Sequence, residues 1–184
     1  MEELSLHLLD IAQNALRAEA TEIRIVLLER EDRFSMTVSD NGVGMKPELL
    51  ARADAPFFTT KKESPNAGLG LPLLKQAAER TGGAFQIQSR HRDEYPDNHG
   101  TCVAAEFVKT HAECAPVGDV IATIMALLHG GQGVDLVFSH EMDSHRVLLD
   151  TREMRAELGE DIPISTPEVL HWIRDSLTEQ YSKK

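Results

Sequence analysis

Three groups of residues in this chain could together hold a phosphorylated ligand. Asp10 and Asn14 lie four positions apart in a segment with helical periodicity, so their side chains would project from one helix face. The block 40–45 reads Asp-Asn-Gly-Val-Gly-Met, and a second glycine pair follows at Gly68 and Gly70. Because glycine has no Cβ, each pair lets the backbone approach a phosphate or a base closely. The ordered set predicts a nucleotide site.

The helical pair supplies groups that phosphate chemistry needs. An amide oxygen such as that of Asn14 can ligate Mg²⁺, and the carboxylate of Asp10 can orient or deprotonate an attacking hydroxyl or water. Taken alone, this spacing is more often a solvated polar stripe on a helix. Its position ahead of two glycine blocks favours the interpretation as a ligand site.

Asp40 follows an alternating segment and begins a Gly-x-Gly turn, which places a carboxylate where the amino group of a base could donate to it. An Asp-Asn-Gly sequence is also a common hairpin turn. Two features argue against a simple hairpin. The glycines continue to Gly44, and the segment after Met45 has a helical pattern instead of that of a returning strand.

The segment Gly68-Leu69-Gly70 ends an irregular stretch and begins a helix. Its backbone N–H groups could therefore meet phosphate oxygens at a positive helix end. The chain contains no Gly-x-x-x-x-Gly-Lys-Ser/Thr, and neither glycine block is a complete Gly-x-Gly-x-x-Gly. The predicted phosphate site is thus neither a P-loop nor a dinucleotide fingerprint.

Hydrophobic periodicity predicts the elements that would position these groups. Residues 3–18 have apolar side chains at the spacing of an amphipathic helix, and alternation over residues 23–38 predicts a hairpin. The remaining predictions are helices over 47–53 and 71–80 and strands over 84–90 and 101–108. The predicted fold class is α+β: a two-layer α/β sandwich in which the three helices cover one face of a mixed or mainly antiparallel sheet.

The ATP-binding unit is predicted to occupy residues 1–109, and residues 110–184 form a small α+β extension of unknown role. The extension holds 13 acidic and 6 basic residues, against 17 and 13 before it. Its predicted elements are helices over 117–129 and 167–180 and a hairpin of strands 134–139 and 146–149. The hairpin tip carries His140, Glu141, Asp143 and His145, but polar residues gather at such tips and two of the spacings fit no structural zinc pattern.

Composition excludes several classes of protein. The chain has 184 residues, of which 41% are hydrophobic and 27% charged, as in ordinary globular proteins. No apolar run approaches the ~20 residues of a membrane helix, and the net charge of -11 disfavours nucleic-acid binding. Two cysteines without a CxxC spacing, and an acidic N-terminus, lead us to expect a cytoplasmic protein.

In combination, the motifs resemble the GHKL superfamily of ATPases, which groups DNA gyrase, heat-shock chaperones, histidine kinases and mismatch-repair ATPases. The resemblance covers residues 4–108 and is closest to the ATP-binding domains of histidine kinases. It implies a Bergerat-type fold with ATP and Mg²⁺ as ligands. The matching motifs are the helix with Asn14 (N box), Asp40 to Gly44 (G1 box), the segment Pro56 to Lys61 (F box and lid entry), Gly68 to Gly70 (G2 box), and Gly100-Thr101 in the closing strand.

The resemblance also assigns roles to individual residues. It implies that Asn14 ligates Mg²⁺ and that Asp40 accepts the adenine amino group. Arg17 occupies a place where related kinases often have a lysine near the phosphates. The other predicted nucleotide-binding residues are Gly42 and Gly44 beside the base and ribose, Gly68, Leu69 and Gly70 around the phosphates, Lys61 in the lid, where it either adds charge or is simply solvated, and Met45 and Thr101.

The predicted catalytic residue, Asp10, departs from the family pattern. At this place hydrolytic members have a glutamate general base, and many histidine kinases have a second asparagine. Aspartate keeps the carboxylate but is one methylene shorter. Hydrolysis, phosphate transfer and simple nucleotide binding therefore stay open.

We expect a stand-alone ATP-binding domain with a regulatory, kinase-like role toward a partner protein, as in the anti-sigma branch. No phosphoacceptor hairpin precedes the first predicted helix, which disfavours self-phosphorylation on histidine. One alternative is a slow ATP hydrolase that closes a lid and forms a homodimer, as in the mismatch-repair branch. The other is a non-enzymatic module in which ATP only orders residues 54–67.

Overall fold

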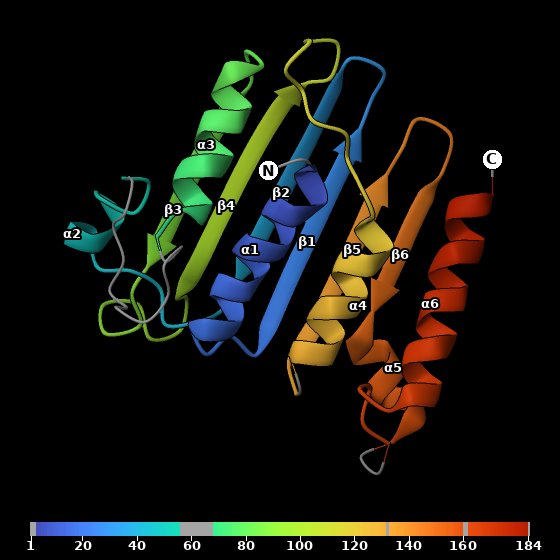
Figure 1. The fold of residues 1–184 in the computed structure, drawn as a ribbon. Helices are drawn as coiled ribbons and strands as arrows, with labels where there is room; N and C mark the ends of the chain where they lie inside the picture. Colours follow the sequence, from blue (N-terminus) through green and yellow to red (C-terminus); the bar gives the residue numbers. More distant parts are fainter. Residues whose placement is uncertain (1–2, 56–67, 132, 160–161, 184) are drawn as a thin grey trace.

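The computed structural model describes residues 3–55, 68–131, 133–159 and 162–183. Its elements are α1 (Leu4–Arg17), β1 (Glu22–Glu29), β2 (Arg33–Asp40), α2 (Pro47–Leu50), α3 (Gly70–Arg80), β3 (Ala84–Arg90), β4 (Gly100–Val108), α4 (Val120–Gly130), β5 (Asp135–Glu141), β6 (Arg146–Asp150), α5 (Thr151–Leu158) and α6 (Pro167–Ser182). A layer of helices lies on a six-stranded sheet (Figure 1). The predicted two-layer α/β sandwich is confirmed.

The strands follow the order β3-β4-β2-β1-β5-β6. All neighbouring strands are antiparallel except β1 and β5, which pair in parallel with Ile23 opposite Leu136 and Leu27 opposite His140. Through this pair the sheet continues without a break from residues 4–108 into the extension.

Alternation along the strands determines which side chains face the helices. In β1 the buried residues are Ile23, Ile25 and Leu27, and their neighbours point to the opposite face. The helices α3, α1, α4 and α6 lie side by side over the buried face (Figure 1). One continuous apolar core results, with Phe34, Phe107 and Phe138 almost completely buried. Each such side chain contributes about 1.5–3 kcal/mol by its removal from water.

The structure differs from the sequence prediction in its helices. No residue of α2 is buried, so α2 does not cover the sheet as predicted, and α4 and α6 complete the helical layer instead. The helix α5 was not predicted. It begins where the side chain of Asp150, the last residue of β6, accepts a hydrogen bond from the backbone N–H of Arg152 at 2.9 Å and so caps the helix. The other predicted elements begin and end within three residues of the observed bounds.

Among the described residues, no helix combines the length and the apolar character that crossing a bilayer requires.

Candidate functional site

The carboxylate of Asp10 lies where α1 meets the start of α3. The face of α1 that packs on the sheet is apolar, with Leu8, Ile11 and Ala15 buried, and the half-buried Asp10 lies beside that face. A Cβ added to Gly70, the first residue of α3, would lie 3.6 Å from both Cβ and Oδ2 of Asp10. The structure thus places the first predicted group beside the third, at a distance where a side chain on Gly70 would be in van der Waals contact with Asp10.

The charged groups on α1 interact with one another. Burial raises the pKa of Asp10, and the positive charge of Arg17 opposes this rise. Arg17 also donates from Nη1 to Oδ1 of Asn14 at 3.2 Å and from Nη2 to Oε1 of Gln13 at 3.4 Å. Asn14, the predicted Mg²⁺ ligand, is therefore hydrogen-bonded to Arg17, the cation predicted to lie near the phosphates. An amide oxygen has two lone pairs, so Asn14 has the acceptor capacity for a metal ion as well.

Asp40 ends β2 with its carboxylate held by the protein backbone. Its Oδ1 accepts a hydrogen bond from the N–H of Gly42 at 2.8 Å. Burial raises the pKa of Asp40, whereas hydrogen bonds from the N–H groups of Gly42 and Thr101, and the nearby charge of His99, act in the opposite direction. The ring of His99 also lies 2.6 Å, through Nδ1, from the carbonyl oxygen of Gly42. The carboxylate is thus a fixed acceptor at the end of the sheet.

The glycines of this turn lie against other parts of the backbone. A Cβ at Gly42 would lie 2.6 Å from the carbonyl oxygen of Ala18, just after α1. At Gly44, which has a φ of +68°, a Cβ would lie 1.9 Å from the carbonyl oxygen of Arg90. Both glycines therefore have a packing role within the protein, because any side chain would collide with backbone. Their contact with a base and ribose stays a prediction.

Asn41 fixes the turn to the beginning of β1. Its Oδ1 accepts hydrogen bonds from the backbone N–H groups of Thr21 and Glu22, both at 2.9 Å, and its Nδ2 donates to the hydroxyl of Thr21 at 2.8 Å. Sequence analysis did not assign Asn41 this role. The side chain is used inside the protein, so it positions the site instead of contacting a ligand.

Ser89 connects three predicted parts of the site and was missed in the sequence. Its Oγ accepts from the N–H of Met45 at 2.8 Å and lies 2.8 Å from the hydroxyl of Thr101. Thr101 in turn lies opposite Asp40 in the β2–β4 pair. A signal was present in the sequence. In β3, Phe85 and Ile87 alternate on the face that packs against the helices, and Ser89 is a polar residue at the next position of the same face.

The phosphate-side segment is described only in part. Lys61 and the rest of residues 56–67 lie outside the described residues. Gly68 has a φ of +83°, a conformation that L side chains rarely adopt, and Leu69 occupies the N-cap position of α3 without a side-chain hydrogen bond. The N–H groups in the first turn of a helix have no intrahelical acceptor, so the start of α3 beside Asp10 offers donors to an anion.

The polar residues at the tip between β5 and β6 have partners other than a metal ion. Nδ1 of His140 lies 2.8 Å from the hydroxyl of Tyr181 on α6. Glu141 accepts from Arg30 at 2.5 Å and from Arg146 at 2.9 Å. Within the described ranges, no group of three or more His, Cys, Asp or Glu side chains is arranged to hold a metal ion.

Comparison with known proteins gives one family and several relatives. The family model described as "Histidine kinase-, DNA gyrase B-, and HSP90-like ATPase" matches residues 2–111. The sensor protein kinase FleS of Pseudomonas aeruginosa is 40% identical over 96 residues, which cover 51% of this chain and 22% of FleS. The sensor histidine kinase ZraS of Salmonella typhi is 35% identical over 85 residues, covering 45% of this chain and 18% of ZraS. The chain thus spans less than a quarter of the length of these relatives.

A solved structure shares this fold. The N-terminal domain of a DNA repair protein aligns with 82% of this chain and 53% of its own, with a TM-score of 0.55 and 16% identity. The catalytic domain of histidine kinase ThkA aligns with 59% of this chain and 67% of its own, with a TM-score of 0.44 and 27% identity. The first alignment is longer than residues 4–108, so the shared fold includes part of the extension.

Proposed function

Because the chain belongs to the family of histidine kinase-, DNA gyrase B- and HSP90-like ATPases, we propose that it binds ATP with Mg²⁺ and phosphorylates or sequesters a partner protein. The observation that carries the proposal is the approach of Asp10 on α1 to Gly70 at the start of α3. This approach supports the proposal, because the first turn of a helix has N–H groups without an intrahelical acceptor, and we expect those of α3 to bind the phosphates beside Asp10.

The adenine end of the proposed site is the carboxylate of Asp40. Two backbone N–H groups orient it, and the exocyclic amino group of adenine is a donor that such a carboxylate can accept. The packed turn at Gly42 and Gly44 and the hydroxyls of Ser89 and Thr101 hold this end in place. The fixed geometry favours binding, because little ordering is needed when the base arrives.

At the phosphate end, we assign Mg²⁺ to Oδ1 of Asn14 together with phosphate oxygens, because this ion takes oxygen ligands and is often held jointly by protein side chains and substrate phosphates. Arg17, which donates to the same oxygen, would then turn toward the phosphates. The guanidinium group is suited to this role, since its N–H groups match the geometry of phosphate oxygens.

The position of Asp10 favours chemistry over passive sensing. Burial raises the pKa of its carboxyl group, and a carboxylate with a raised pKa is a better proton acceptor than an exposed one. We therefore assign Asp10 as the base that acts on the hydroxyl of a partner protein. If water takes the place of that hydroxyl, the same geometry supports the slow hydrolase that closes a lid and dimerises.

Nucleotide binding is tested by thermal unfolding with ATP and Mg²⁺. We expect Asp40→Asn to abolish the stabilisation seen in the wild type, which is about 2.7 kcal/mol at a ligand concentration of 100 Kd. Asp32→Asn, at an exposed position remote from the turn, serves as the matched control and keeps it. Equal stabilisation of Asp40→Asn and the wild type would show that Asp40 does not bind adenine.

The reaction is tested separately with γ-labelled ATP and protein captured from a lysate. Asp10→Asn should still bind ATP but should lose label transfer or phosphate release by about 10²–10⁴-fold, the usual contribution of a general base. If both rates are unchanged in the variant, Asp10 is not a base, and the nucleotide-sensing module becomes the better description.

A further inference from the structure

The two edges of the sheet differ in how they are covered. The outer strands are β3 and β6 (Figure 1). On β6, the side chain of Gln180 bonds to both backbone groups of Leu148: its Oε1 accepts from the N–H at 2.8 Å, and its Nε2 donates to the carbonyl oxygen at 3.1 Å. Val147 and Leu149, on either side of Leu148, are buried. A carboxamide thus takes the place of a further strand and blocks this edge.

The edge of β3 has no such cover in the part of the chain that the structure describes. The strand is paired with β4 along Ala84–Arg90, and no hydrogen bond from a described residue outside this pair reaches the backbone of Phe85 or Ile87. Both side chains face the helices but are only half-buried, whereas their partners on β4, Ala105 and Val103, are buried. An added strand would cover both side chains and pair the backbone groups of this edge.

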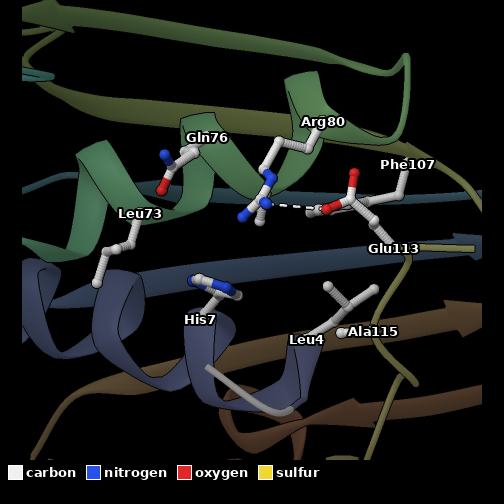
Figure 2. A pocket seen from close by; sticks show the side chains of 9 residues that line it. Leu4, His7, Leu73, Gln76, Arg80, Phe107, Glu113 and Ala115 are labelled. Carbon is white, nitrogen blue, oxygen red and sulfur yellow. Dashed lines mark ion pairs between the residues drawn. The ribbon is translucent and has the colours of Figure 1, made fainter.

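The strand β3 also lacks the devices that protect an edge. Natural proteins protect long edges with charged residues, proline or bulges. Residues 84–89 contain neither charge nor proline, and their register with β4 has no bulge. The one charged residue of the strand, Arg90, lies with its guanidinium 5.6 Å from the ring centre of Tyr95. Arg80, at the end of the helix over β3, forms an ion pair of 2.8 Å with Glu113, as the dashed line in Figure 2 shows.

The sequence of β3 is compatible with antiparallel pairing to itself. With a twofold axis at Ile87, the residues that face each other across two copies are Ile87 and Ile87, Phe85 and Ser89, Gln86 and Gln88, and Ala84 and Arg90. The glutamines lie on the exposed face, where their amides can bond to one another. No like charges stand opposite each other in this register. Because each chain has a net charge of -11, two copies meet with the least repulsion at an uncharged edge.

We propose that the chain forms a homodimer in which β3 pairs with β3 of a second copy. The two six-stranded sheets would join into one continuous sheet, with the helices of both copies on the same face. An extended segment of another protein could use the same backbone groups, but the self-complementary register favours a second copy. The interface is one strand wide, so we expect weak, micromolar association. It does not depend on nucleotide binding.

The proposal is tested by sedimentation velocity of the full chain without nucleotide, from micromolar to submillimolar concentration. Gln86→Lys/Gln88→Lys places two lysines opposite each other at both glutamine pairs, so we expect the dissociation constant of the dimer to rise about tenfold. Gln86→Lys/Gln88→Glu places a lysine opposite a glutamate at the same pairs and should dimerise at least as well as the wild type. Only the antiparallel register centred on Ile87 predicts this recovery.

A control variant separates the interface from the change in net charge. Thr178→Lys/Ser182→Lys adds the same two charges at exposed positions of α6 and should keep the dissociation constant of the wild type. Thermal unfolding shows that each variant is folded. A wild type that stays monomeric at submillimolar concentration, or a dimer unaffected by Gln86→Lys/Gln88→Lys, would overturn the proposal. Failure of Gln86→Lys/Gln88→Glu to dimerise would contradict the proposed register.

Discussion

The two parts of the sheet are stabilised in different ways. In residues 4–108, backbone segments approach each other so closely that Gly42 and Gly44 leave no room for a Cβ, and the side chain of Asn41 bonds to backbone groups. In the extension, the buried residues of the helices are mainly apolar, and Gly133 and Gly159 have open space around them. The turn at Gly42 and Gly44 is thus fixed in one arrangement by the surrounding backbone, whereas the turns at Gly133 and Gly159 have space for a side chain.

The difference indicates where substitutions should affect function and where only stability. A core can adapt to changes of side-chain shape if its volume is kept. A turn that lies against backbone cannot adapt in this way. Matched substitutions in the two parts should therefore differ in their effects.

Removal of a buried phenylalanine tests whether the two parts unfold together. Phe107→Ala in β4 and Phe138→Ala in β5 should each lower the free energy of unfolding by about 3–5 kcal/mol, since both side chains are almost completely buried. Because the sheet is continuous, we expect one cooperative transition in each variant, measured by urea unfolding with both circular dichroism and tryptophan fluorescence. Two separate transitions in Phe138→Ala would show that the extension unfolds by itself.

Addition of a Cβ compares the turns directly. Gly44→Ala should lower the free energy of unfolding by about 3 kcal/mol or more. The left-handed backbone conformation costs alanine about 1–2 kcal/mol, and the added Cβ would also collide with the carbonyl of Arg90. Gly133→Ala, with a φ of +83° and nothing within 4 Å, should cost only the strain. Thermal unfolding of both variants measures the difference. Equal losses would mean that the turn at Gly44 moves easily.

The two buried histidines should differ in their response to acid. The pKa of folded His7 is about 4, below its ordinary 6.5, so the unfolded chain binds a proton that the folded chain excludes. The free energy of unfolding should therefore fall as the pH decreases from about 6.5 to about 4, by at most about 3 kcal/mol. Above about pH 6.5, His7 is neutral in both the folded and the unfolded chain, so it no longer lowers the free energy of unfolding.

His140 provides the comparison in the extension. Burial also lowers the pKa of His140, but the neighbouring Glu29 opposes the effect. We expect His7→Gln to reduce the acid sensitivity of unfolding more than His140→Gln does. Urea unfolding at pH 7 and at pH 4.5 measures both. A larger change in the His140 variant would contradict the order of the two histidines.

The smallest expected effects come from lost hydroxyl groups. Thr151 is fully buried, and its Oγ1 accepts from the N–H of Leu136 at 2.8 Å, so Thr151→Val should cost about 1–3 kcal/mol while Thr151→Ser retains the bond. Ser89→Ala removes a similar acceptor from Met45. Ser89 is only half-buried, so water can replace it and the loss should be below about 1 kcal/mol. A larger cost for Ser89→Ala than for Thr151→Val, measured by urea unfolding, would reverse this order.

The sequence was informative wherever the signal was local. Helical periodicity located α1, and alternation located β1 and β2, because spacing along the chain determines which face a side chain occupies. However, alternation along a strand does not specify which strands pair with it. A strand has two hydrogen-bonding edges, and the short turn after β1 assigned only one of them, to β2. The parallel partner β5 could not be inferred from the pattern of β1.

Much the same limit applies to the candidate site. The Asp10, Asp40 and Gly70 groups were found from motifs, and the structure places Asp10 beside Gly70. The supporting contacts join residues far apart in sequence, as between His99 and Gly42, which are 57 positions apart. A single side chain with a partner at such a distance leaves no periodic signal, so these contacts required coordinates.

The parallel pair of β1 and β5 has a consequence for biosynthesis. A ribosome completes β1 at Glu29 but reaches the start of β5 only at Asp135. During that interval one edge of β1 has unpaired N–H and C=O groups, which can template pairing with another nascent chain. Closure of the sheet must await the emergence of β5, and contacts between such distant segments form slowly. Strand β5 thus protects the edge of a strand that is synthesised well before it.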